Sequence, residues 1–122
     1  MSKDVYEALH FVGLALVLLA LGGVVTHVAN GGTKQSNTFR KTVMISHGVG
    51  LLLLLVGGFG MLAKLGIQGV PLWVAIKLAV WLILGALVGV IYRKPSAAKS
   101  FWFLIPVLVL IATLAAVTKI GA

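Results

Sequence analysis

The sequence predicts an all-α integral membrane protein, an up-down bundle of four transmembrane helices. Hydrophobic residues make up 61% of the 122 residues and charged residues only 10%, a composition that excludes a soluble globular domain. The hydrophobic residues gather into four runs, each close to the 20 or so residues that a helix needs to cross a bilayer. Because the segments between the runs are short, we predict a single membrane domain, 1–122.

Polar or glycine-containing segments separate the predicted spans, as expected for exposed loops. The first span follows a short polar tail, and the second follows the segment ANGGTKQSNTFRKT. Helices joined by short loops are antiparallel neighbours, which gives the up-down order. The predicted transmembrane helices are about 8–28, 43–63, 71–93 and 101–119.

The basic residues indicate how the chain is oriented. Loops 29–42 and 93–100 hold six of the ten Lys and Arg residues, so the positive-inside rule places both loops in the cytoplasm and both termini outside. We expect a bacterial inner membrane. The net charge of +8 does not indicate nucleic-acid binding, because the basic residues flank apolar spans instead of forming a patch with interleaved aromatic residues. The absence of cysteine excludes disulfides, thiolate catalysis and iron–sulfur clusters.

The third span contains a lysine, Lys77. Placing an ionisable side chain within a transmembrane helix costs about 2.5–3.5 kcal/mol of insertion free energy. Trp73, Lys77, Trp81, Gly85 and Gly89 recur every four residues, which predicts a stripe that faces inward. The two glycines would let a neighbouring helix approach closely. Alternatively, the Lys77 ammonium extends along its own stem to the membrane interface.

The second span has small residues near one helical face, which predicts close packing against a neighbouring helix. These residues are Ser46, Gly50, Gly57 and Gly60.

Three histidines lie near the ends of the first two spans. With a rise of about 1.5 Å per residue, His10 lies in the same outer half of the membrane as Lys77, and Gly13 would leave room beside the His10 ring. His27 and His47 lie in the inner half and form a second possible pair. Each histidine also has a structural interpretation, as an interface or packing residue.

Three segments resemble a known family. His10 in YEALHFVGLALVLL, His47 in RKTVMISHGVGLLLLLVGG and Lys77 in LWVAIKLAVWLILGALVGVIYRK together resemble the SirB family of small four-helix bacterial membrane proteins. Ser46 stands where that family has a proline, and Gly50 stands near the place of its aspartate. The third span carries the most specific part of the resemblance.

The positions of His10 and Lys77 also resemble HemJ, a family of membrane protoporphyrinogen oxidases associated with b-type haem. That resemblance implies that the histidine and the lysine are functionally required. The chain lacks the longer acidic first loop of that family.

Two main functions follow as hypotheses. Composition favours a non-enzymatic accessory or structural protein in the lipid bilayer, because no nucleophile with a base is visible; catalytic residues, and whether the chain is an enzyme, remain open. Its contacts with a second copy or a larger complex would run through Gly85, Gly89, Gly50 and Gly57.

The alternative is a protein that binds b-type haem or another tetrapyrrole. His10 would ligate the iron, Lys77 would pair with a propionate, and Gly13 would make room; a two-histidine site would use His27 and His47. A small transporter or channel is a third reading, which the absence of an acidic residue within any span disfavours.

Overall fold

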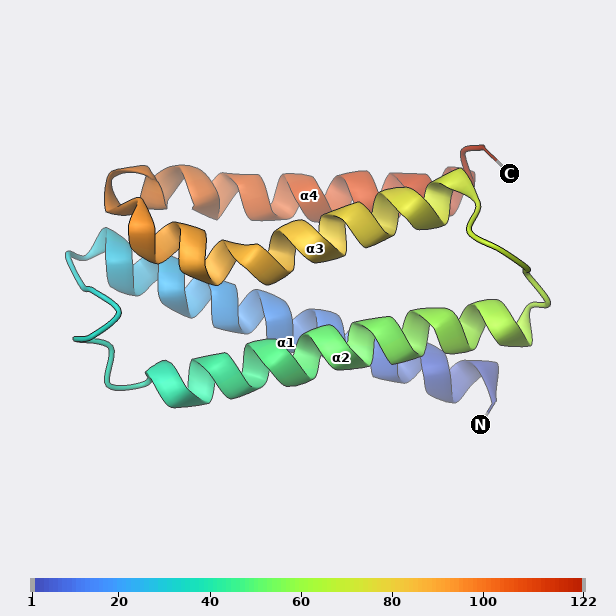
Figure 1. Cartoon of the computed structure of the whole chain (residues 1–122), viewed down its shortest axis with the longest axis horizontal. Helices are drawn as coiled ribbons and strands as arrows, with labels where there is room; N and C mark the ends of the chain where they lie inside the picture. The colour runs from blue at the N-terminus through green and yellow to red at the C-terminus, as the bar shows by residue number, and fades with distance from the viewer. Residues whose placement is uncertain (1, 122) are drawn as a thin grey trace. The chain divides into compact units, whose positions relative to one another are not determined.

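The structure is a computed structural model that describes residues 2–121, and throughout this range the regular structure is helical, with no strand (Figure 1). Each of the four long helices is apolar and long enough to cross a membrane. The all-α class is therefore confirmed, and the predicted spans match the helices closely. The helices are α1 (Lys3–Ala29), α2 (Arg40–Lys64), α3 (Leu72–Arg93) and α4 (Ala98–Thr118), with a short 3₁₀ helix η1 (Pro95–Ala97) before α4.

Glycines end α1 and α2 in the same way. The Gly31 N–H donates to the Val28 carbonyl and the Gly32 N–H to the His27 carbonyl, which is the Schellman pattern of a helix C-terminus. Gly31 has a φ of 88°, in the left-handed region that glycine adopts without a Cβ clash. Gly66 closes α2 with the same pair of bonds and a φ of 72°. These ends explain why a glycine lies two residues after the last residue of each helix.

The chain divides into two compact units, which are described separately. One unit contains the residues up to Leu21 together with Phe39–Gly69, and the other contains Gly22–Thr38 together with the residues from Val70 onward. The helix α1 contributes to both units, since it is continuous from Lys3 to Ala29. The single membrane domain stays a prediction.

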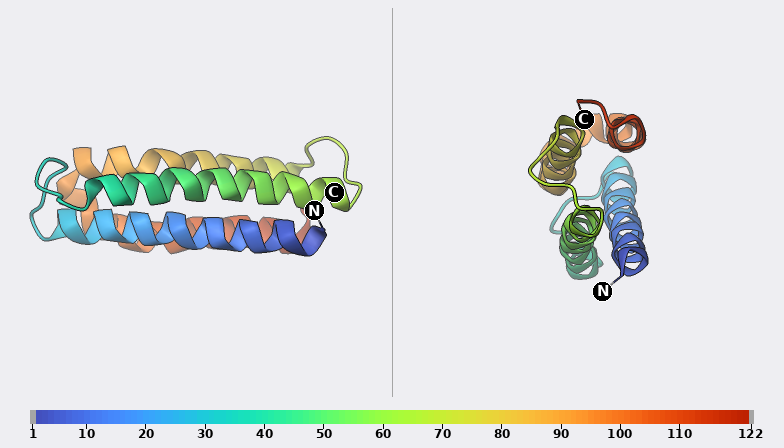
Figure 2. Two further views of the ribbon diagram at one scale, coloured as in Figure 1. Left: turned by 90° about the horizontal axis from the view of Figure 1, so that it is seen from below. Right: turned by 90° about the vertical axis from the view of Figure 1, so that its right-hand side faces the viewer.

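In the first unit, α1 and α2 lie side by side as an antiparallel pair, as the views in Figure 2 show. Their backbones meet at glycines. A Cβ added at Gly57 would lie 2.6 Å from the main-chain nitrogen of His10, and one added at Gly50 would lie 2.8 Å from the Gly13 carbonyl oxygen. A Cβ at Gly60 would collide with the Tyr6 ring. The predicted glycine face of α2 is therefore confirmed, and its neighbour is α1 of the same chain.

In the second unit, α3 and α4 form an antiparallel hairpin joined by η1 (Figure 1). The Asn37 side-chain amide donates to the Tyr92 hydroxyl at 2.9 Å, which ties the loop after α1 to the last turn of α3. At the opposite end, the Lys119 ammonium lies 5.6 Å from the centre of the Trp73 ring, within the range of a cation–π interaction.

The predicted stripe on α3 is wrong at its end. Trp73 is buried, but Gly89 is exposed, and a Cβ added there would meet no atom within 4 Å. Successive i+4 steps each rotate by about 40° in a helix of 3.6 residues per turn, so four steps turn Gly89 about 160° away from Trp73. The buried positions instead alternate steps of three and four residues. They include Trp73, Val80, Leu84, Leu87 and Ile91.

Candidate functional site

His10 is held by a hydrogen bond to the neighbouring helix. Its half-buried ring lies on α1, and Nδ1 is 2.9 Å from the main-chain carbonyl oxygen of Leu54 on α2. Because a carbonyl can only accept, Nδ1 carries the proton and donates, and the lone pair of the neutral ring lies on Nε2. Metal-binding histidines are commonly oriented by such a bond from the second ring nitrogen. The arrangement therefore suits either packing or ligation through Nε2.

The room that was predicted beside the His10 ring is not at Gly13. A Cβ added at Gly13 would lie 2.7 Å from the Gly50 carbonyl oxygen and 2.7 Å from the Leu54 nitrogen, so the α2 backbone fills that space. Gly13 therefore does not leave a gap for a flat cofactor. Its physical role is to let the two helices approach, and this approach brings His10 within reach of the Leu54 carbonyl.

His47 is a buried histidine on α2. It is 4% exposed and is the one polar side chain classed as buried within residues 2–121. It belongs to the same unit as His10. The residue that His10 contacts, Leu54, lies seven positions further along α2, which is about 10 Å along the helix axis. His47 and the point where His10 contacts α2 are therefore well separated along that helix. The burial of His47 is typical of a packed imidazole.

His27 fastens the loop that follows α1. Its Nε2 lies 2.8 Å from the Thr33 carbonyl oxygen, to which it donates, and 3.2 Å from the Ser36 hydroxyl. Gly32 packs directly against the ring, where a Cβ would collide. Since Nε2 is engaged by Thr33, a ligand would have to use Nδ1. His27 and His47 belong to different units, and their pairing stays a prediction.

Lys77 lies half-buried on α3 without a polar partner among residues 2–121. The sequence has two acidic residues, Asp4 and Glu7. Both lie near the start of α1, and Glu7 pairs with Lys3 at 3.2 Å. Lys77 and His10 belong to different units, so their shared site also stays a prediction. No group of three His, Asp or Glu side chains suited to a metal ion occurs in the described part of the chain.

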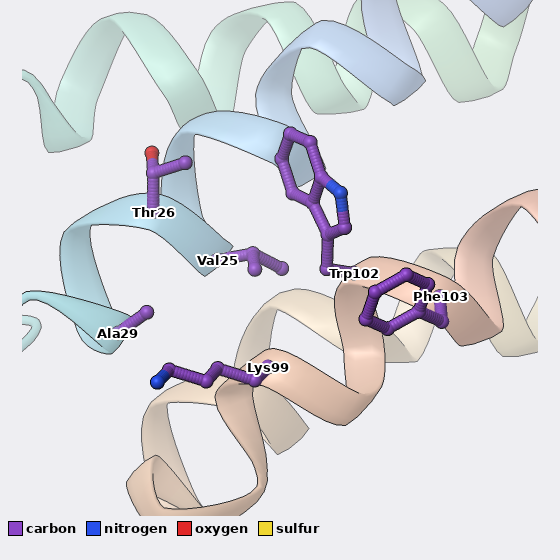
Figure 3. Close-up of a pocket in the computed structure, with 6 residues that line it drawn as sticks. All are labelled: Val25, Thr26, Ala29, Lys99, Trp102 and Phe103. Atoms are coloured by element: carbon purple, nitrogen blue, oxygen red, sulfur yellow. The ribbon is translucent and has the colours of Figure 1, made fainter.

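One feature of the second unit was missed by the sequence reasoning. A groove of about 240 Å³ lies between the end of α1 and the start of α4 (Figure 3). The signal for it was a lysine followed closely by three aromatic residues at the start of the fourth span, which is a common pattern at a membrane interface. The groove is lined by Val25, Thr26, Ala29, Lys99, Trp102 and Phe103.

Comparisons of the chain with protein-family models, with curated proteins and with solved structures find no match.

Proposed function

We propose that this chain is a small, SirB-like accessory membrane protein without enzymatic activity, inserted as an up-down four-helix bundle in a bacterial inner membrane. The observation that carries the proposal is the distribution of apolar side chains. Each of the four long helices exposes large ones, which lipid would cover. Examples are Leu19 on α1, Leu52 on α2, Leu82 on α3 and Phe103 on α4, between 58% and 73% exposed.

The contacts between α1 and α2 support a structural role. The neighbouring helix of the same chain fills the space beside Gly13, Gly50 and Gly57. The ring N–H of His10 donates to a main-chain carbonyl. These features fasten two helices together where lipid provides no hydrophobic drive for association. Gly89 differs, because it is exposed and open. We place the contact with a second copy or a larger complex there.

Cysteine labelling tests the insertion and its orientation. The chain contains no cysteine, so single cysteines can be introduced without background. Cysteines replacing Gln35 and Ser96 should react with a membrane-impermeant maleimide only after the cells are opened. Cysteines replacing Ser2 and Gln68 should react in intact cells with a permeable outer membrane. The opposite pattern would overturn the orientation, and labelling of a cysteine at Leu52 before detergent is added would overturn insertion.

A matched pair of glycine variants tests the accessory role. Gly89→Leu should abolish self-association or co-purification with a partner complex, because the side chain blocks close approach of another helix. Gly48→Leu is the control, since Gly48 on α2 is also exposed with no atom within 4 Å of an added Cβ. Equal recovery of partners with the Gly89→Leu variant and the parent would contradict the role of Gly89.

Haem or tetrapyrrole binding is the second candidate, and the bond from His10 to Leu54 is the observation that favours it. With Nδ1 donating, Nε2 has the lone pair that an iron ligand needs. Lys77 would supply the positive charge for a propionate, and no side chain among residues 2–121 neutralises it. The HemJ-like chemistry would then belong to the tetrapyrrole, while the chain would bind and orient it.

Absorption spectra of detergent-purified protein from haem-replete cells separate the candidates. A Soret band that His10→Ala removes would establish haem ligation by His10, and a band that instead requires His27 and His47 would establish the two-histidine site. Lys77→Ala should weaken haem retention while the band position is kept. Featureless spectra after haem is added would eliminate the second candidate.

A further inference from the structure

The groove at the end of α1 has a lysine at one end and aromatic side chains further along. Lys99 is the second residue of α4, and Ala29 is the last residue of α1, so this end of the groove lies where the helices stop. Figure 3 shows the Lys99 side chain extending toward Ala29, away from Trp102 and Phe103. The two aromatic residues follow Lys99 by about 4.5 and 6 Å along the helix axis. The groove is thus apolar, and the Lys99 ammonium lies just beyond it, where the helices stop.

The walls of the groove are otherwise apolar. Val25 and Ala29 line the α1 side, and the Thr26 hydroxyl donates within its own helix, to the carbonyl oxygens of Gly22 and Gly23. A Cβ added at Gly22 would lie 3.9 Å from the Trp102 ring, so the indole rests against α1. A flexible hydrocarbon chain fits such a wall, whereas a polar molecule would find almost no partners.

The Lys99 ammonium has no counter-ion among residues 2–121. Neither the Lys99 ammonium nor the Trp102 indole N–H makes a hydrogen bond or ion pair among residues 2–121. Both carboxylates of the sequence lie near the opposite end of α1. An occupant with an anionic head and an apolar tail complements both the Lys99 ammonium and the apolar groove.

We propose that this groove binds an anionic glycerophospholipid from the leaflet that contacts loops 29–42 and 93–100. Lys99 contacts the headgroup phosphate at the end of the groove, and an acyl chain lies against Val25, Trp102 and Phe103. The proposal rests on the membrane insertion proposed above. A lysine close to an anionic membrane surface strengthens association about fivefold, and this sets the expected selectivity.

Native mass spectrometry of the full chain, released from detergent with equal amounts of phosphatidylglycerol and phosphatidylcholine, tests the site. We expect phosphatidylglycerol adducts to exceed phosphatidylcholine adducts about fivefold, and K99Q to remove this preference. K64Q is the matched control, because Lys64 lies outside the groove at the end of α2, and it should leave the preference unchanged. Trp102→Ala should reduce the adducts of both lipids.

Two outcomes overturn the site. Equal adducts of both lipids on the parent would eliminate the charge selectivity, and a preference that survives K99Q would place the lipid elsewhere. A second measurement separates these failures from failure of insertion. Brominated phosphatidylcholine in liposomes should quench the fluorescence of the three tryptophans. Quenching without phosphatidylglycerol preference defeats only the lipid site, whereas no quenching defeats the membrane insertion on which it rests.

Discussion

Gly57→Ala should separate α1 from α2. The added Cβ would lie 2.6 Å from the His10 nitrogen and the Tyr6 carbonyl oxygen, and 2.8 Å from the His10 Cα. All three are main-chain atoms, so no rotamer change can relieve the contact. Non-bonded atoms prefer about 3.5 Å or more, so the helices must move apart by nearly 1 Å. A gap of that size forfeits a quarter to a half of the dispersion energy across the interface.

The bond from His10 to the Leu54 carbonyl is 2.9 Å long. The same movement of the helices lengthens it beyond useful hydrogen-bonding distance. Overpacking of about 1–3 kcal/mol and loss of a hydrogen bond worth about 1 kcal/mol together predict a destabilisation of about 2–4 kcal/mol. Dyes on cysteines at Ser2 and Gln68, both in the first unit, would report separation of the helices by energy transfer during a dodecyl sulfate titration in micelles.

Gly48→Ala is the control for this titration, because an added Cβ there meets no atom within 4 Å. Its free energy of unfolding should equal that of the parent or exceed it by up to about 1 kcal/mol, since alanine favours the helix over glycine by that amount. If Gly57→Ala unfolded at the same detergent fraction as Gly48→Ala, the close backbone contact between α1 and α2 would be refuted.

Three further substitutions have expected outcomes. Lys77→Met should improve membrane insertion of α3 by up to about 2.5–3.5 kcal/mol in a translocon assay, since the described residues offer the ammonium no partner; unchanged insertion would mean that the ammonium already reaches the interface. Tyr92→Phe removes the bond from Asn37 and should speed tryptic cleavage of loop 29–42 about fivefold, for a hydrogen bond worth about 1 kcal/mol; an unchanged rate would show that the bond does not restrain the loop. His10→Ala should destabilise the α1–α2 pair by about 1 kcal/mol in the same titration, and no change would indicate that the bond to Leu54 contributes nothing.

Hydropathy and glycine positions predicted the helices well because both act locally. Length and apolar composition determine the spans, and Gly31 and Gly66 adopt backbone angles at the helix ends that only a residue without a Cβ reaches easily. The glycine face of α2 was likewise predictable, since Gly50, Gly57 and Gly60 lie close to one side of a regular helix.

The sites were harder to predict because they depend on which element fills a given space. Gly13 was expected to make room for a cofactor, but α2 occupies that room. The stripe that ends at Gly89 was misjudged because a drift of about 40° per step accumulates over several turns. His27 was expected as a ligand candidate, yet its ring bonds to Thr33 in a loop whose path the sequence does not determine. To predict the groove at Lys99, one must know that α1 ends beside the start of α4.

The glycine contact between α1 and α2 has a consequence for how the pair responds to temperature. In a soluble protein, helices associate by removing apolar surface from water, which gives a large heat-capacity change and weakens on cooling. In a bilayer, Gly13, Gly50 and Gly57 exchange lipid contacts for backbone contacts, and little water is released. The free energy of pairing should therefore vary almost linearly with temperature, and cooling should strengthen the pair instead of loosening it.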